Sequence, residues 1–162
     1  MLTAERLREL VRYDPETGIF TNRITRNSKA LKDKPSGGLG AGGYIQITLD
    51  GITYYAHRLA VLYVTGSWPS NQIDHENKIR SDNKWNNLRD ATSKQNRANT
   101  DALSNSKTGV KGVRWRSSTG RYLAEIRLNN RHIHLGSFET IEEAAAAYKA
   151  AAVLAHGKFA RS

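Results

Sequence analysis

The sequence predicts a chain of the α+β fold class that is divided into two small domains. Stretches with apolar residues at helical spacing occur alongside short runs in which apolar and polar residues alternate, a mixture that predicts both helices and strands. Hydrophobic residues make up 38% of the 162 residues, a share that favours two small cores over one large core. Residues 101–108 are polar and lack periodicity. We therefore expect one domain over residues 1–100 and a second over residues 109–162, joined by this linker.

The N-terminal domain begins with a predicted helix over residues 3–12, where apolar residues recur at helical spacing and Thr3 is a suitable N-cap. The segment DPETG predicts a turn, and a short strand is expected over residues 19–21. Residues 26–43 are first basic and then rich in glycine. This composition predicts a flexible surface loop.

A β-hairpin is predicted over residues 44–55. Two alternating runs flank Asp50-Gly51, and this dipeptide is typical of two-residue hairpin turns because both positions need a positive φ. Residues 57–64 then read as a buried helix. His57 opens this helix, and we expect a packing role for it, whereas Arg58 is a candidate contact to a DNA phosphate.

The C-terminal domain is predicted to be a three-stranded antiparallel sheet packed on one helix. The three alternating runs cover residues 110–116, 121–128 and 131–138. A helix is expected from Ile141 to His156, and Thr140 with Glu143 forms a capping box at its start. Trp115, Leu128, Ile133 and Phe138 are expected to supply packing.

The charge of the chain predicts a polyanionic partner. The formal net charge is +10, and residues 105–162 contribute +6 of it (10 basic and 4 acidic side chains). Nucleic acid is the usual partner of so basic a chain, although a basic protein without that role is the alternative. The absence of cysteine excludes disulfides and thiolate zinc sites and fits an intracellular setting. No apolar run reaches ~18 residues, so we expect no membrane partner.

Residues 73–96 carry an ordered set of side chains suited to phosphodiester hydrolysis. That reaction needs a base to activate water and a cation to neutralise charge in the transition state. Asp74 and Asn96 offer hard oxygen ligands, which suit Mg²⁺ or Mn²⁺. His75 would point away from Asp74 if both lie on a strand. Asn87 lies between these positions, where its amide can bridge backbone groups and close the loop.

The pattern Asp-His, then Asp-Asn-x-x-x-Asn-Leu, then Thr-x-x-x-Asn resembles the HNH motif of phage-encoded and intron-encoded homing endonucleases. The resemblance implies a nuclease domain of two strands and a helix around one metal ion, preceded here by the helix and the hairpin. It implies that His75 is the general base, that Asp74 and Asn96 bind the metal, and that Asn87 is the middle Asn. Many relatives have His at the third position, so Asn96 fits the homing branch.

The C-terminal domain resembles the AP2 domain, a three-stranded DNA-binding module. The resemblance rests on the segments GVR, AEIR, LGSF and EEAA, which begin at residues 112, 124, 135 and 142. Family members lay the sheet in the major groove with the helix behind it. By motif position, the expected DNA contacts are Lys111, Arg114, Arg116, Arg121, Arg127 and His134. His134 replaces the usual tryptophan of the family, and His132 stands where Arg is common, which leaves the target sequence open.

Taken together, these features predict a metal-dependent endonuclease that recognises double-stranded DNA. A DNA-binding regulator with a non-catalytic HNH scaffold is the main alternative, and an RNA-binding protein is the third. No heptad pattern or extended apolar helix face points to a dimer, so we expect a monomer that nicks one strand. If the chain is phage-encoded, the setting is the host cytoplasm.

Overall fold

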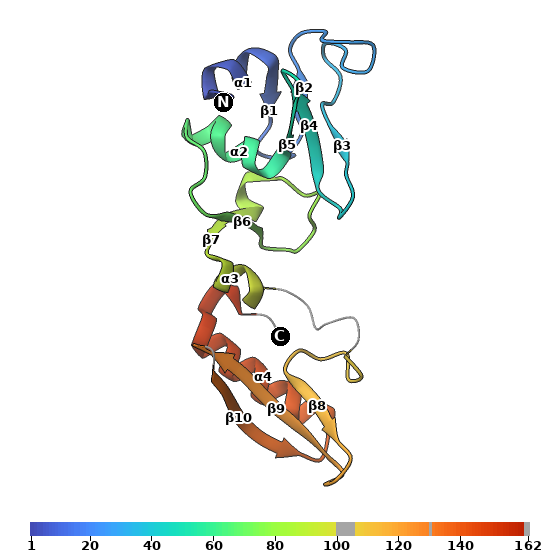
Figure 1. Ribbon diagram of the computed structural model, residues 1–162, viewed down its shortest axis with the longest axis vertical. Helices are drawn as coiled ribbons and strands as arrows, with labels where there is room; N and C mark the ends of the chain where they lie inside the picture. The colour runs from blue at the N-terminus through green and yellow to red at the C-terminus, as the bar shows by residue number, and fades with distance from the viewer. Residues whose placement is uncertain (100–105, 130, 161–162) are drawn as a thin grey trace. The chain divides into compact units, whose positions relative to one another are not determined.

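The computed structural model describes residues 1–99, 106–129 and 131–160 (Figure 1). The chain forms two compact units, Met1–Ser93 and Lys94–Ser162, and each contains a hydrophobic core of its own. The fold class is α+β, as the sequence predicts. The domain boundary at residues 101–108 stays a prediction, because residues 101–105 lie outside the described part of the chain.

The first unit contains short helices and three small antiparallel sheets. Its elements are α1 (Ala4–Leu10), β1 (Val11–Tyr13), β2 (Phe20–Asn22), β3 (Gly38–Leu39), β4 (Ile45–Leu49), β5 (Ile52–Tyr55), α2 (Ala56–Thr65), β6 (Gln72–His75), η1 (Trp85–Asn87) and β7 (Leu88–Ala91). Strand β1 pairs with β2, β4 lies between β3 and β5, and β6 pairs with β7. The helix α3 (Ser93–Ala98) begins at the end of this unit.

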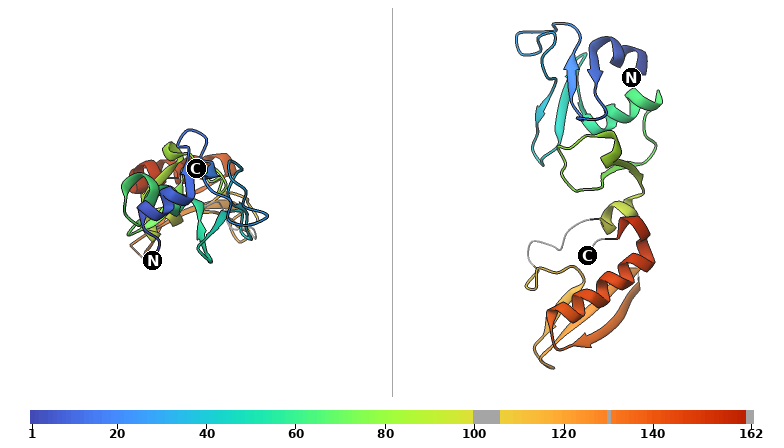
Figure 2. Two further views of the ribbon diagram at one scale, coloured as in Figure 1. Left: turned by 90° about the horizontal axis from the view of Figure 1, so that it is seen from above. Right: turned by 180° about the vertical axis from the view of Figure 1, so that it is seen from behind.

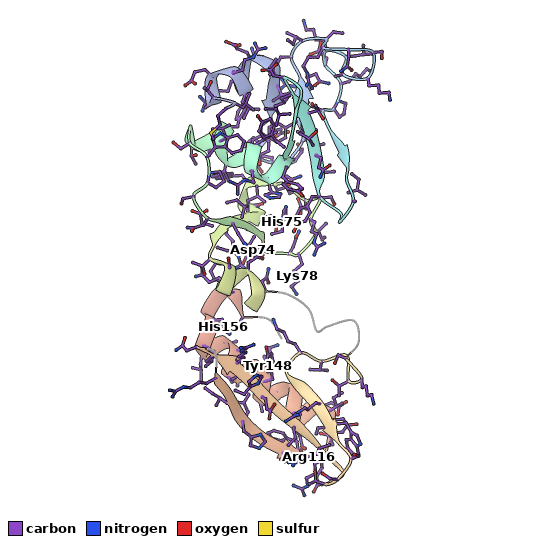
Figure 3. The ribbon with its side chains drawn as sticks, in the orientation of Figure 1. Asp74, His75, Lys78, Arg116, Tyr148 and His156 are labelled. Carbon is purple, nitrogen blue, oxygen red and sulfur yellow. The ribbon has the colours of Figure 1, made fainter. Side chains whose placement is uncertain are left out.

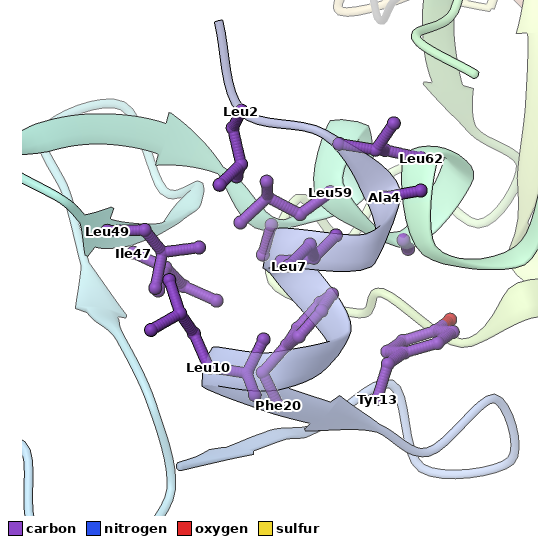
Figure 4. Close-up of a cluster of buried hydrophobic side chains, with 13 residues drawn as sticks. Leu2, Ala4, Leu7, Leu10, Tyr13, Phe20, Ile47, Leu49, Leu59 and Leu62 are labelled. Atoms are coloured by element: carbon purple, nitrogen blue, oxygen red, sulfur yellow. The ribbon is translucent and has the colours of Figure 1, made fainter. Parts of the chain in front are cut away.

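The core of the first unit gathers apolar side chains from α1, α2 and the β4 strand (Figure 4). Leu7 and Leu59 are fully buried at its centre, and Leu49 covers it from the sheet. Burying a leucine side chain contributes about 1.5–3 kcal/mol, so this cluster is the main source of stability for a unit with such short strands. It fixes α2, and with it the start of the segment that leads to β6.

The N-terminal helix is shorter than the sequence pattern predicts. Thr3 caps it as expected, since its hydroxyl accepts a hydrogen bond from the Arg6 amide at 3.2 Å. The helix ends at Leu10, and Val11 has extended backbone angles and pairs with Asn22. The prediction that the helix continues to residue 12 is therefore wrong. Val11 is β-branched and is buried as well in a strand as on a helix face, so its apolar character did not distinguish the two.

The β4–β5 hairpin confirms the prediction over residues 44–55. Asp50 and Gly51 have φ angles of 47° and 79°, as a two-residue turn of this kind requires. The preceding segment is more ordered than the predicted flexible loop, because Gly38–Leu39 pairs with β4. The guanidinium of Arg26 is also tied down, since it donates hydrogen bonds to the Asn22 and Ser36 side chains at 2.7 and 3.0 Å.

The second unit is a three-stranded antiparallel sheet covered on one face by a long helix (Figures 1 and 2). Its elements are β8 (Val113–Arg116), β9 (Arg121–Leu128), β10 (Arg131–Phe138), α4 (Ile141–His156) and η2 (Gly157–Phe159). The predicted capping box is present, because the Thr140 hydroxyl accepts from the Glu143 amide and the Glu143 carboxylate accepts from the Thr140 amide, each at 3.2 Å. The strands and the helix match the prediction, except that β8 begins at residue 113 instead of 110.

The core of the second unit lies between the sheet and α4. Ala144, Tyr148 and Ala152 of the helix pack against Ala124 and Ile126 of β9. Small helix residues allow the helix to approach the sheet closely, and Tyr148 fills the space that remains.

Two residues that were expected to supply packing are only half-covered, because Trp115 and Ile133 are 48% and 43% exposed. The Trp115 ring instead makes an edge contact with Tyr122 at 4.8 Å. Leu128 and Phe138 pack against the core as expected.

Replacing Gly112 with alanine is expected to destabilise the second unit strongly. Gly112 has a φ of +72°, and an added Cβ would lie 2.1 Å from the Tyr148 ring. Gly120→Ala is the matched control, since Gly120 also has a positive φ of +60° but has no atom within 4 Å of the added Cβ. We expect the Gly112 variant to lose ~1–3 kcal/mol more than the control through overpacking. Hydrogen exchange of the β9 amides measures the difference, and equal losses would contradict the prediction.

Among the described residues, no helix combines the length and the apolar character that crossing a bilayer requires.

Candidate functional site

The strand β6 carries the two central residues of the predicted site (Figure 3). Asp74 and His75 are consecutive, and both are buried. Successive side chains of a strand point to opposite faces, and the two residues have different surroundings accordingly. Asp74 contacts Arg89, its register partner on β7, whereas the His75 ring lies beside Asn83.

Arg89 holds the Asp74 carboxylate from the neighbouring strand. Its Nε and one terminal nitrogen lie 2.9 and 2.8 Å from the same oxygen of Asp74, Oδ2. The other terminal nitrogen lies 3.4 Å from the Glu76 carboxylate. The Arg89 side chain is 11% exposed and that of Asp74 is 6% exposed, so the pair is largely withdrawn from water. Charge-assisted hydrogen bonds in such a setting fix the position of the carboxylate.

The His75 imidazole lies in a cluster of rings. The ring of His57 meets it edge-on at a centroid distance of 5.1 Å, and the ring of Tyr44 lies 5.9 Å away. The Nε2 atom of His75 is 3.3 Å from the Oδ1 atom of Asn83. Burial lowers the pKa of His75, and the Asn83 contact opposes that shift. Burial therefore favours the neutral form of the imidazole, which is the form that can accept a proton.

His57 has the packing position that the sequence predicts. It lies at the start of α2 and is buried, and its Nδ1 atom has no hydrogen-bond partner within the described part of the chain. Burial is the main cause that lowers the pKa of His57 to about 3, and the proximity of Arg58 and of the His75 ring acts in the same direction. A neutral ring results, and it packs against Tyr44, Tyr55 and His75.

Asn87 closes the loop between β6 and β7. Its Oδ1 atom accepts from the Asn77 amide at 2.9 Å, while its Nδ2 atom donates to the Asp82 carbonyl oxygen at 2.8 Å and to the Asn77 Oδ1 atom at 3.0 Å. The side chain thus bridges the two ends of the loop, as its position in the sequence suggests. The Asp82 carboxylate adds a further link by accepting from Asn77 Nδ2 at 2.7 Å.

Asn96, the second predicted metal ligand, lies in α3. It belongs to the part of the chain that follows Ser93, so its role beside Asp74 stays a prediction. Among the described residues, no three His, Cys, Asp or Glu side chains gather into a metal cluster. Within the first unit the buried Asp74 carboxylate is a hard oxygen donor, of the kind that Mg²⁺ or Mn²⁺ binds while keeping several water ligands.

Arg58, a predicted DNA contact, uses its guanidinium inside the first unit. It donates to the Pro69 and Asn71 carbonyl oxygens at 3.2 and 3.3 Å and lies over the Trp68 ring. These contacts hold the loop between α2 and β6. A contact from Arg58 to DNA stays a prediction.

The second unit presents its predicted DNA-contacting arginines on one face of the sheet. Ala124 and Ile126 of β9 face α4, so the residues that alternate with them face away from the helix. Arg114 pairs with Leu123 and Arg116 pairs with Arg121. Residues that pair across two strands lie on the same face of the sheet, so the arginines of β8 and β9 share one face. The arginines of this face are Arg114, Arg116, Arg121 and Arg127. We call it the arginine face.

Two carboxylates form ion pairs with arginines of the arginine face. Arg114 pairs with Glu125 at 2.8 Å, and Arg121 pairs with Glu139 at 3.0 Å. His134 is the register partner of Glu125, which places it on the same face as a neighbour of these arginines. Lys111 precedes β8 and is half-buried.

Sequence reasoning missed Asn83 and Arg89 as parts of the site. Both occur in the segment that the sequence singles out, but their types are common in turns and on strand surfaces. Their roles follow from pairing, since β6 and β7 bring Asp74 opposite Arg89 and the intervening loop brings Asn83 back to His75. Asn83 is a fixed position of the pattern Asp-Asn-x-x-x-Asn-Leu, but the pattern indicates no contact for it, and Arg89 has no signal beyond its place in a polar run.

Comparison with known proteins gives three findings. Residues 54–98 match the family model described as HNH endonuclease, and residues 108–157 match the model of the AP2 domain. A search of curated proteins found no match. Among solved structures, the chain is similar to one described as "DNA binding and cleavage by the HNH homing endonuclease I-HmuI", with 25% identity and a TM-score of 0.42.

That similarity covers 55% of this chain and 50% of the other, so the chain spans about half the length of the structure that it matches. The two family matches carry the assignment. The first includes Asp74 and His75 of β6 and Asn87 of η1, and the second includes the arginine face. The chain therefore contains a segment that matches the HNH endonuclease family, residues 54–98, followed by a segment that matches the AP2 domain family, residues 108–157.

Proposed function

We propose that this protein is a metal-dependent DNA endonuclease of the homing type that nicks one strand of a recognised site. The observation that carries the proposal is the pair Asp74 and His75 on β6, one held by Arg89 and the other buried in neutral form, inside the segment that matches the HNH endonuclease family. A carboxylate for a cation and an imidazole for a proton are the two groups that phosphodiester hydrolysis needs.

In this proposal His75 acts as the general base. Its imidazole takes a proton from the attacking water, and its fixed position holds that water in line with the scissile phosphate. Asn87 keeps the β6–β7 loop closed, so that Asp74 and His75 keep their places. Asp74 and Asn96 would hold Mg²⁺ or Mn²⁺, which when bound supplies charge neutralisation at the phosphate and at the leaving 3′-oxygen.

The arginine face is proposed to read double-stranded DNA. A guanidinium matches the O6 and N7 acceptors of guanine and also grips phosphate. The net charge of +10 supports a polyanionic partner. We propose that the HNH domain spans residues 1–100 and the AP2 domain residues 109–162, with residues 101–108 between them. In this arrangement one domain cuts and the other selects the site.

Plasmid cleavage tests the function. Supercoiled DNA with Mg²⁺ or Mn²⁺ is expected to give open circles first, because one active site in a monomer faces one strand for each binding event. Omission of the metal should stop the reaction. Direct conversion to linear DNA would contradict a monomeric nicking enzyme and would indicate two active sites that cut both strands together. DNA binding without any cleavage under either metal would favour a regulator with a non-catalytic HNH scaffold.

Replacing Arg127 with alanine is expected to weaken DNA binding. A bidentate contact to a base is worth ~1–3 kcal/mol, whereas loss of one phosphate contact lowers the slope of log K against log salt by ~0.9. Lys149→Ala is the matched control, because it removes the same charge from an exposed position on α4. Fluorescence anisotropy at several salt concentrations measures both quantities. Equal effects of the two substitutions would mean that only net charge matters.

A further inference from the structure

We propose that Asn83 sets the tautomer of His75, keeping the ring proton on Nε2 so that Nδ1 carries the lone pair that accepts a proton from water. The inference rests on the proposed role of His75 as the general base. It makes Asn83 a positioning residue, since it acts through His75 and not on the DNA. The argument has three steps: the orientation of the Asn83 amide, the fixation of the Asn83 backbone, and the confinement of the His75 ring.

The hydrogen bonds of Asn83 fix which end of its amide faces the imidazole. The Nδ2 atom donates to the Ser81 carbonyl oxygen at 3.2 Å, and the Oδ1 atom lies 3.3 Å from His75 Nε2. Rotating the amide by 180° would place Oδ1 against the Ser81 carbonyl, so two acceptors would face each other. An amide oxygen only accepts, and a neutral imidazole has one donor nitrogen and one acceptor nitrogen. The donor facing Asn83 is therefore Nε2, which leaves the lone pair on Nδ1.

The backbone of Asn83 is fixed by the turn that follows β1. The Tyr13 hydroxyl donates to the Asn83 carbonyl oxygen at 2.6 Å, and the Trp85 amide donates to the Pro15 carbonyl oxygen at 2.9 Å. The turn approaches so closely that a Cβ on Gly18 would lie 2.5 Å from the Asn83 carbonyl carbon. Asn83 itself is 2% exposed. The Asn83 side chain therefore contacts His75 from a fixed backbone position, and its burial keeps water from competing for the contact.

The His75 ring is confined by its aromatic neighbours. The His57 ring stands nearly perpendicular to it, at 81°, and the Tyr44 ring is inclined to it by 50°. The Arg80 guanidinium lies over the Tyr44 ring, 5.1 Å from its centroid, and donates to the Gly42 carbonyl oxygen at 2.8 Å. These contacts restrict rotation of the imidazole, so Nε2 stays directed at Asn83. A fixed ring with a fixed proton is the arrangement that a general base needs.

The test is nuclear magnetic resonance of the full chain with ¹⁵N-labelled imidazole rings, in which the His75 signals are identified by their loss in His75→Ala. In the unsubstituted protein we expect a protonated Nε2 and an unprotonated Nδ1. In Asn83→Leu we expect a mixture of tautomers and a ~10–100-fold slower cleavage, with unchanged DNA affinity. Asn86→Leu is the matched control, because Asn86 lies in the same loop with an exposed side chain.

Asn83→Asp provides the conservative variant. Its carboxylate also accepts from Nε2, so the tautomer should be kept and most of the cleavage restored. The ¹⁵N signals of His75 in Asn83→Asp should therefore again show the ring proton on Nε2, as they should in Asn86→Asp.

The proposal is overturned if the unsubstituted protein has its ring proton on Nδ1, or if Asn83→Leu keeps both the tautomer and the rate. Should the leucine variant fail to fold, the aspartate variant decides, because a His75 ring proton on Nδ1 in that variant would show that an acceptor at residue 83 does not set the tautomer. Failure of the proposed function is a separate result. In that case the Nε2 proton is observed as expected, but no metal supports DNA cleavage.

Discussion

Replacing His75 with alanine is expected to abolish measurable DNA cleavage while leaving DNA affinity nearly unchanged. Loss of a general base typically costs ~10²–10⁴-fold in rate. The imidazole is buried among Asn83, His57 and Tyr44, so it contributes little of the exposed positive charge that attracts the DNA backbone. Single-turnover cleavage of a labelled duplex gives the rate, and a gel-shift titration gives the affinity.

A buried ring also contributes to packing, and the control must separate this from chemistry. His57→Phe is suitable for comparison, because it changes a neighbouring ring of the same cluster and keeps an aromatic side chain in the space. If His75→Ala cuts at the rate of the unsubstituted protein, the base has been assigned to the wrong residue. A joint loss of cleavage, binding and thermal stability would show that His75 has a structural role instead.

The sequence predicts those parts of the fold whose signals are local. The Asp50-Gly51 turn, the capping box of Thr140 and the alternation in the three strands of the second unit each depend on neighbouring residues, and the structure confirms all three. The segment around Val11 depends on distant pairing with Asn22. The Val11 side chain would be buried both in a longer helix and in a strand, so local periodicity does not distinguish the two structures.

The residues of the candidate site also fall into two groups, those that the sequence identifies and those that only the structure identifies. Asp74, His75 and Asn87 belong to an ordered motif and can be identified from their spacing. Arg89 and Asn83 acquire their roles only when the β6–β7 pair and its loop are formed. The residues that carry the chemistry are therefore visible in the sequence, whereas the residues that orient them become visible in the structure.

Exposure was the least predictable property of the second unit. Trp115 and Phe138 both read as core residues, but only Phe138 packs against the buried cluster. A single helix covers this sheet and does not reach every side chain on its apolar face. How far the helix extends over each strand depends on the position of the whole element, which no short pattern contains.

Replacing Asp74 with asparagine is expected to reduce cleavage and metal affinity together, and also to reduce stability. The substitution keeps the shape of the side chain but removes the charge that faces Arg89 at 2.8 Å. Removing one partner of a buried ion pair typically lowers the free energy of unfolding by ~3–5 kcal/mol. The nearby Glu76 carboxylate, at 3.4 Å from Arg89, should offset part of that loss. Urea unfolding measures the stability, and calorimetric titration of Mn²⁺ measures the metal affinity.

Asp90→Asn supplies the matched control for Asp74→Asn, because Asp90 lies on β7 next to Arg89 but has an exposed side chain. It removes the same charge without breaking the buried pair, so it should leave stability, Mn²⁺ affinity and rate nearly unchanged.

The double variant Asp74→Asn with Arg89→Met then separates the two roles of Asp74. Removing the Arg89 guanidinium as well should restore much of the stability, since a buried pair can often be replaced by apolar side chains at little cost. It should not restore Mn²⁺ binding or cleavage, because the carboxylate oxygens are still absent. Recovery of cleavage in the double variant would mean that Asp74 serves only to neutralise Arg89, and the metal-ligand assignment would then have to be withdrawn.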